Sequence, residues 1–239
     1  VVCDCVDDET QDLVPVAPRS ILRRQLARLA DAGFTAKMGS ELEFYLFRDD
    51  FRAAREKHYH DLRTAGDYVE DYHVLSSTFA EPVIGAIRRL VDASAIGVEF
   101  SKGEWGPGQH EINLRYAEAL EMADRHVLYK TAAKEIAAQQ GHSLTFMAKW
   151  NAAMAGSSLH VHMSLWNDRD QPVFAPAGEA APLFHHFIGG LLAHAHELSW
   201  LFAPTVNSYQ RYRAGTFATT RIEWSVDNRA AGFRVVGEG

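Results

Sequence analysis

Two acidic side chains, Glu104 and Glu111, flank a Gly-Pro-Gly turn in the stretch GEWGPGQHEIN. Two more, Glu41 and Glu43, lie two residues apart in SELEFYLF, and His160 follows in SLHVHMSLW. Carboxylates on neighbouring strands repel one another unless a cation lies among them, and we expect no lysine on this face. Oxygen-rich ligands with a single imidazole favour hard ions, Mg²⁺ or Mn²⁺, over zinc.

Each glutamate, taken alone, could be a solvated strand residue. The two acidic motifs together in one chain favour a metal centre instead, because so many clustered charges need a counter-ion. Centres of this kind usually keep open coordination positions for substrate phosphates. The sequence therefore predicts a divalent metal centre that handles a phosphorylated ligand.

Arginines are concentrated near the C-terminal end of this acidic chain, at Arg211, Arg213, Arg221, Arg229 and Arg234. Such local density indicates a place where carboxylate or phosphate is held bidentately. Scattered surface arginines are an equal alternative from spacing alone.

Charge and composition exclude several classes of protein. The 239 residues contain 24 Lys plus Arg against 31 Asp plus Glu, a net charge of −7, so neither nucleic acid nor an anionic membrane is an expected partner. A metal-dependent nuclease or phosphatase would need a basic face. The most apolar stretch, LFHHFIGGLLAHAHELSWLF, is interrupted by four histidines and a glutamate, which argues against a membrane span. We find no signal peptide and expect a cytoplasmic protein.

The two cysteines, Cys3 and Cys5, cannot form a disulfide framework. We expect them in a buried strand, and a metal-binding pair is the alternative. Three histidines, His58, His60 and His73, lie in the weakly periodic segment 48–73, which we predict to be a long surface excursion. These histidines are more often solvated than metal-bound.

The acids and His160 must be positioned by strands of alternating polarity, which we predict at residues 40–47, 110–116 and 158–166. The apolar face of each strand is expected to pack on helices, while the polar face lines a cleft. Helical periodicity predicts helices at residues 18–33, 79–95, 117–141 and 182–202. The fold class is therefore α+β, with a functional sheet surface.

In chain order, the motifs ELE, EWGPGQHEIN, GSSLHVHMS, NSYQR and DNRAAGFR resemble the catalytic domain of the glutamine synthetase superfamily. The resemblance implies a curved antiparallel sheet flanked by helices, two Mg²⁺ or Mn²⁺ sites, and ATP as co-substrate. It also implies a ring-shaped homo-oligomer, a dodecamer, with active sites between subunits. Residues 1–239 are expected to be a partial catalytic domain that lacks the N-terminal β-grasp domain and the C-terminal end, with its last metal-binding glutamate.

The resemblance also assigns roles to individual residues. One metal ion is expected on Glu43, Glu104 and Glu111, and a second, which bridges the ATP phosphates, on Glu41 and His160. The residues expected to hold the nucleotide are Glu99, Tyr116, His162 and Ser164. Those expected at the glutamate substrate are Gly156, which receives its amino group, Arg211, which binds its carboxylate, and Arg229 and Arg234, which neutralise the transferred phosphoryl group.

One position departs from the ammonium-using pattern. Six residues past Arg211, where glutamine synthetases carry a glutamate, this chain has Phe217. A phenyl ring accepts no proton but can line a slot for an amine, as in the γ-glutamyl-amine ligase branch. The expected reaction joins the γ-carboxylate of L-glutamate, activated by ATP, to a polyamine, ethanolamine or a monoamine. The alternatives are a glutamine synthetase that uses ammonium and a non-catalytic assembly or regulatory protein.

Overall fold

One long strand, β1 (Thr35–Phe47), organises the fold. The computed structural model describes residues 2–175, 180–213 and 216–237. On one side of β1 lie β3 (Gln109–Glu118) and then β2 (Val98–Gly103). On its other side β4 (Ser143–Thr145) pairs near one end and β5 (Leu159–Trp166) near the other, and all these pairings are antiparallel.

The strand register sets which polar side chains meet. Glu43 lies opposite Glu111 of β3, and Glu41 lies between Asn113 of β3 and His160 of β5. Because side chains alternate along a strand, Glu41 and Glu43 share one face of the sheet. The sheet therefore brings acids from distant parts of the chain to one surface.

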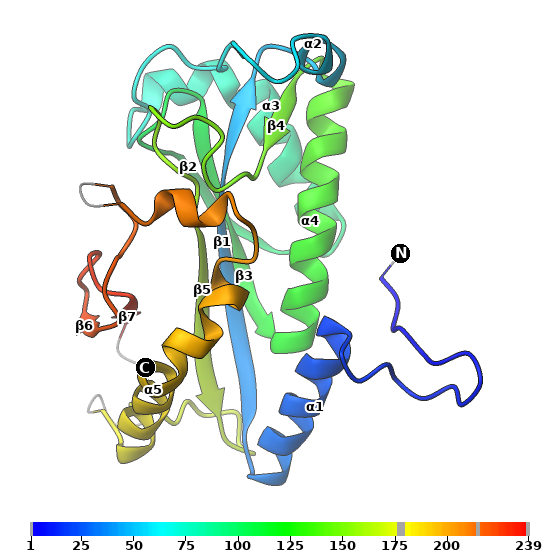
Figure 1. The fold of residues 1–239 in the computed structure, drawn as a ribbon, viewed down its shortest axis with the longest axis vertical. Helices are drawn as coiled ribbons and strands as arrows, with labels where there is room; N and C mark the ends of the chain where they lie inside the picture. The colour runs from blue at the N-terminus through cyan, green and yellow to red at the C-terminus, as the bar shows by residue number, and fades with distance from the viewer. Residues whose placement is uncertain (1, 176–179, 214–215, 238–239) are drawn as a thin grey trace.

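The opposite face of the sheet carries the hydrophobic core. Leu42, Phe44 and Leu46 of β1 are buried there against α3 (Val74–Ala93) and α4 (Ala119–Gln139). Full burial of one such side chain contributes about 1.5–3 kcal/mol. Figure 1 shows α4 running alongside the sheet, and α1 (Pro18–Asp31) contacts both β1 and α4. The helices α3 and α4 thus cover the apolar face of the sheet.

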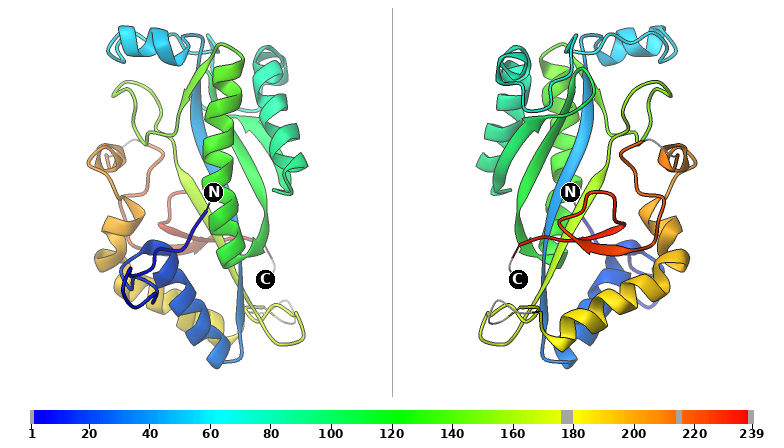
Figure 2. Two further views of the ribbon diagram at one scale, coloured as in Figure 1. Left: turned by 90° about the vertical axis from the view of Figure 1, so that its right-hand side faces the viewer. Right: turned by 90° about the vertical axis from the view of Figure 1, so that its left-hand side faces the viewer.

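The rest of the chain forms smaller or more peripheral elements. These are α2 (Phe51–Glu56), α5 (Pro182–Phe202), the 3₁₀ helix η1 (Ser208–Arg211), and the parallel pair β6 (Trp224–Val226) and β7 (Phe233–Val235). Figure 2 shows α3 and α4 on one side of the sheet and the segment from α5 to β7 on the other. Among the described helices, none has an apolar stretch long enough to cross a lipid bilayer.

The α+β class, the antiparallel sheet and the flanking helices are confirmed. The helix predicted at 79–95 begins earlier, at Val74, because the His73 side chain caps it by accepting a 3.1 Å hydrogen bond from the backbone N–H of Ser76. The first predicted strand also begins earlier, at Thr35. Strand β2 and the short elements were not predicted.

Two expectations about the fold are wrong, the second of them in part. Cys3 and Cys5 are exposed and lie outside the strands, because the segment before α1 makes no sheet pairing beyond one isolated bridge. The apolar side of β5 is exposed at Leu159, Val161 and Met163, and it is buried only at Leu165, which belongs to a small core cluster against which Leu26 and Leu29 of α1 pack. The expectation that each apolar strand face packs on helices therefore holds for β1 and β3, and for β5 only at Leu165.

Candidate active site

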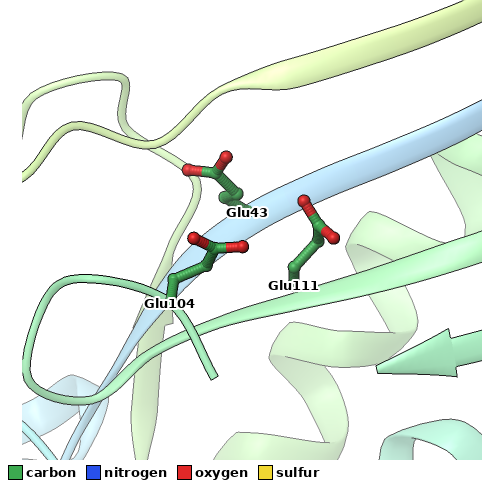
Figure 3. A group of neighbouring side chains, drawn as sticks. All are labelled: Glu43, Glu104 and Glu111. Carbon is green, nitrogen blue, oxygen red and sulfur yellow. The ribbon is translucent and has the colours of Figure 1, made fainter. Parts of the chain in front are cut away.

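Three carboxylates converge on the polar face of the sheet. Glu43 comes from β1, Glu111 from β3, and Glu104 from the turn between β2 and β3. One oxygen atom of each lies within 4.8 Å of the other two. Figure 3 shows the three side chains pointing toward one another. Strand pairing therefore brings together the three glutamates that the resemblance groups at one metal ion.

The turn that carries Glu104 is built around two glycines. The Glu104 N–H donates to the Gln109 carbonyl at 2.8 Å, which closes the hairpin. A Cβ atom on Gly106 would lie 1.9 Å from the Tyr45 hydroxyl, and Gly108 has a φ of +71°. Only glycine fits both positions, so the turn returns one carboxylate of the hairpin beside the other.

Burial raises the pKa of all three carboxylates, and repulsion between carboxylates adds to the shift for Glu104 and Glu111. Burial, followed by the nearby Glu104, Glu41 and Glu43 carboxylates, raises the pKa of Glu111 to about 7. Burial and the charge of Glu43 likewise raise the pKa of Glu104, and burial raises that of Glu43. A set of close oxygen donors that cannot all ionise comfortably fits a divalent cation.

The expectation that no lysine lies among these acids is wrong. The Lys102 ammonium is 2.6 Å from a Glu104 oxygen and 3.2 Å from Asp71, and it lies 4.6 Å from the centre of the Tyr72 ring. Lys102 and Glu104 are two residues apart around the end of β2, so recognising that strand would have placed them on one face. One ammonium balances only one of the three carboxylates, so the fit to a divalent cation stands.

Glu41, at the second acidic position, is hydrogen-bonded to His162. Glu41 lies opposite His160 in the strand register, but its carboxylate is 2.7 Å from Nε2 of His162. This hydrogen bond lowers the pKa of Glu41 and raises the pKa of His162. Burial lowers the pKa of His160, which suits a neutral ligand. Of the side chains the structure describes, only the three glutamates bring three possible ligand atoms this close together.

The residues expected to hold a nucleotide extend along the same face. His162 and Ser164 lie two residues apart on β5 and therefore share one face of the strand. Tyr116 stacks on Trp166 with ring centres 6.3 Å apart. The Trp166 indole donates to the Ser164 hydroxyl at 2.8 Å. Glu99 is exposed on β2, and its charge contributes to the raised pKa of His162. The Trp166 ring, which sequence reasoning did not single out, adds a flat surface to this group.

The two residues expected at the ends of the amino-acid substrate lie side by side. The Arg211 guanidinium donates to the Ser157 carbonyl at 2.9 Å. A Cβ atom on Gly156 would lie 2.6 Å from Nε of Arg211 and 2.7 Å from the Ala148 carbonyl oxygen. The glycine therefore lets the backbone pass directly beside the arginine.

The other two arginines interact with different acids. A hydrogen bond with Tyr72 raises the pKa of Arg229, and the charge of Glu104 contributes to the same shift. Arg234, on β7, is among the positive charges that lower the pKa of Glu41. Arg229 thus interacts with the charge of Glu104 and Arg234 with that of Glu41.

Phe217 is exposed and makes one aromatic contact. Its ring centre is 5.5 Å from that of Trp105, in an edge-to-face arrangement. Trp105 directly follows Glu104 in the turn. Sequence reasoning did not single out Trp105, although it stands inside the acidic motif.

Comparison with known proteins agrees with this geometry. The sequence model of the family described as glutamine synthetase, catalytic domain, matches residues 15–239. A γ-glutamylethanolamide synthetase of Streptomyces coelicolor is 48% identical over 95% of this chain and 49% of its own length. A glutamate–isopropylamine ligase of Pseudomonas is 32% identical over 99% of this chain and 52% of its own.

Solved structures agree as well. The structure of apo GmaS superposes with a TM-score of 0.82 at 29% identity, covering 95% of this chain and 52% of that one. The present chain spans about half the length of the curated relatives it matches. It belongs to the glutamine synthetase family, with the sequence and fold of the catalytic domain.

Proposed function

We propose that this chain is the catalytic part of an ATP-dependent ligase that joins the γ-carboxylate of L-glutamate to a small organic amine. The observation that carries the proposal is the position of Phe217, which packs on Trp105, the residue that follows the expected metal ligand Glu104 in the chain. An aromatic wall at that place favours an amine with carbon substituents over ammonium.

The acids supply the metal-binding part of the site. Glu43, Glu104 and Glu111 would hold one Mg²⁺ or Mn²⁺, and Glu41 and His160 a second. The close, buried oxygen donors of the first set support this assignment. Divalent ions bound there would offset the negative charge of the phosphates and of the glutamate γ-carboxylate.

The remaining residues bind and orient the substrates. The Gly156 carbonyl accepts from the glutamate amino group, Arg211 pairs with its α-carboxylate, and Arg229 and Arg234 balance charge on the transferred phosphoryl group. ATP is held by Glu99, Tyr116, His162 and Ser164.

The reaction has two steps. The γ-phosphoryl group of ATP is transferred to the glutamate γ-carboxylate, and an amine nitrogen then attacks the resulting acyl phosphate and displaces phosphate. Water must be excluded, because it would hydrolyse the same intermediate. The name of one relative gives a γ-glutamylethanolamide as its product, and that of the other gives isopropylamine as its substrate. Both names support an organic amine in the second step.

Assembly belongs to the same proposal. We place the active sites between subunits of a ring-shaped homo-oligomer, a dodecamer, as the family resemblance implies. The solution mass of the complete protein tests this directly, and a monomer would contradict it.

The main experiment offers the complete protein ATP, Mg²⁺ and L-glutamate with one amine at a time. The panel contains ammonium, ethanolamine, isopropylamine, putrescine and spermidine, and mass spectrometry identifies the γ-glutamyl product. We expect an organic amine to have the highest kcat/KM. A clear preference for ammonium would refute the proposed acceptor.

A pair of variants tests the role of Phe217. Phe217→Glu places a proton acceptor where ammonium-using enzymes have one, so we expect relative activity to move toward ammonium. Phe217→Leu keeps an apolar side chain without the aromatic edge and should retain the preference for organic amines. Equal amine profiles in both variants would show that this position does not select the acceptor.

A non-catalytic protein is the rival from another class. Thermal unfolding with Mn²⁺ and ATP separates the two, because a ligand at a hundred times its Kd stabilises the folded state by about 2.7 kcal/mol. Absence of any stabilisation in the complete protein would favour the non-catalytic alternative.

A further inference from the structure

Gln109 connects three parts of the site that are distant in sequence. Its side chain is almost fully buried at the start of β3. The side-chain nitrogen is 3.1 Å from a Glu43 oxygen, 3.0 Å from the Gly156 carbonyl oxygen and 3.2 Å from the Ser157 hydroxyl. The side-chain oxygen accepts a 2.9 Å hydrogen bond from the Gly106 N–H.

These partners fix the orientation of the amide. The N–H of Gly106 can only donate, so it must meet the amide oxygen, and the amide nitrogen is turned toward the acceptors. That nitrogen carries two hydrogens and faces three acceptors, so every hydrogen is used. A carboxylate of the same shape would keep the bond to Gly106 but would donate to none of the acceptors.

Two of the three acceptors, the Glu43 carboxylate and the Gly156 carbonyl, belong to groups with a proposed role in the site. The Glu43 oxygen that Gln109 contacts also accepts from the backbone N–H of Ser158 at 3.0 Å, and the other Glu43 oxygen accepts from the Ser158 hydroxyl. The Gly156 backbone lies directly against Arg211. A carbonyl oxygen has two lone pairs, so a bond from Gln109 leaves the second one of Gly156 free. A continuous path of contacts therefore runs from Glu43 through Gln109 to the backbone beside Arg211.

We propose that Gln109 is a positioning residue that fixes the distance between the Glu43 carboxylate and the Gly156 carbonyl. The inference rests on the proposed function, in which the first binds a metal ion and the second binds the substrate amino group. Gln109 acts through these groups and touches neither the metal nor the substrate. Its loss should therefore weaken metal and glutamate binding together while leaving the nucleotide face unchanged.

The test uses Gln109→Met in the complete protein, because methionine has a similar length but no amide group. Free Mn²⁺ is counted by electron paramagnetic resonance, and the site that disappears in Glu111→Ala identifies the three-glutamate centre. We expect Gln109→Met to weaken Mn²⁺ binding at that centre about tenfold, the scale of losses when a partner of a metal ligand is removed. The KM for glutamate should rise by about the same factor, while the KM for ATP stays within about twofold.

Ser157→Ala is the matched control, because it removes one acceptor of the same amide and leaves Glu43 and Gly156 bonded. We expect Mn²⁺ affinity and the KM for glutamate to be close to wild type. A drop as large as that of Gln109→Met would overturn the assigned path, since it would reflect general disturbance of the segment.

Gln109→Glu serves as a second variant if methionine prevents folding. It keeps the bond to Gly106 but places an oxygen against the Gly156 carbonyl, so the KM for glutamate should rise at least tenfold, the scale of losses seen when such a partner is removed. An unchanged KM for glutamate in both variants would overturn the inference, as would an equal rise in the KM for ATP.

Failure of the inference is distinguishable from failure of the proposed function. Wild-type protein that binds Mn²⁺ at the Glu111-dependent site, with Gln109→Met binding equally well, refutes only the role of Gln109. Wild-type protein without that Mn²⁺ site refutes the proposed metal centre and the inference together.

Discussion

The Lys102 ammonium lies 2.6 Å from the Glu104 carboxylate, within the cluster of acids on the polar sheet face. It also reaches Asp71 at 3.2 Å, so it has a partner outside the cluster. A cation built into a proposed metal centre competes with a metal ion for the same carboxylate. The affinity of the centre for a metal ion should therefore depend on whether Lys102 pairs mainly with Glu104 or with Asp71.

Replacing Lys102 with methionine should tighten Mn²⁺ binding at pH 8 by roughly tenfold, because a like charge close to the metal is removed. Asp71→Asn is the opposing control, since it removes a negative charge and leaves Lys102 to pair with Glu104 alone, so Mn²⁺ binding should weaken. Isothermal titration of both variants measures the two affinities. A shift of both in the same direction would contradict competition.

The raised pKa of Glu111 predicts how the stability of the metal-free protein depends on pH. Burial and neighbouring carboxylates raise its pKa from 4.5 to about 7 in the folded protein. The folded state therefore keeps this proton longer than the unfolded state does, and stability falls as pH rises from about 4.5 to about 7. Above that range the loss is complete.

Glu111→Gln removes this titration, so at pH 8 the metal-free variant should be more stable than wild type by about 3 kcal/mol. At pH 4 the two proteins should differ little. Urea unfolding across the pH range measures the difference, which also cancels contributions from other titrating groups. Parallel stability curves for the two proteins would show that Glu111 ionises normally in the fold.

Glu70 supports the turn that carries Glu104 from behind. Its carboxylate accepts from the Gly108 N–H at 3.1 Å and lies 3.4 Å from Nε2 of His110, and both side chains are almost fully buried. Glu70→Ala should lower the free energy of unfolding by about 2–3 kcal/mol, because it leaves buried polar groups unpaired.

Glu70→Gln should cost clearly less, since an amide keeps the acceptor for Gly108 and offers a donor to His110. Burial lowers the pKa of His110 to about 4, so this histidine is neutral at pH 7 and can accept that bond. Denaturant unfolding compares the two variants. Equal losses would mean that the volume of the side chain, and not its hydrogen bonding, stabilises the turn.

Gly156→Ala should lower kcat/KM for glutamate by about a hundredfold, the effect of a displacement near 1 Å at a reacting centre. The added methyl group would collide with Arg211 and the Ala148 carbonyl. Gly189→Ala is the control, because a Cβ atom there meets nothing within 4 Å on α5. That control should stabilise the helix by about 0.5–1 kcal/mol and keep activity. Similar kinetics in the two variants would remove Gly156 from the substrate site.

The long periodic elements were predictable from sequence because their patterns are local. The helix at 182–202 has the predicted bounds, and the motif strands lie where alternation indicates. Strand β2 was missed because its six residues, which include two exposed and only one buried, become a strand through pairing with β3. The position of Lys102 beside Glu104 depends on that pairing, so sequence reasoning missed it too.

Burial was less predictable than secondary structure. Alternation correctly separates the two faces of β5 but does not tell which face another element covers. Val161, on the apolar face, was therefore expected to be buried, whereas it is exposed. Cys5 was placed in a buried strand from residue type alone, whereas it is exposed and its segment forms only one isolated bridge, between Val6 and Leu13, among the described residues. Both errors concern contacts between distant segments, which local patterns do not encode.

The pairing of β1 with strands on both of its edges has a consequence for biosynthesis. Leu42 pairs with Ile112 on one edge and with Leu159 on the other, about 120 residues later in the chain, and such non-local contacts slow folding. During translation, β1 leaves the ribosome with two unpaired edges long before β5 is made. Of the strands in this sheet, β1 therefore stays without a pairing partner for the longest time during synthesis. Its unpaired edges are where a nascent chain is exposed to aggregation and where chaperones would protect it.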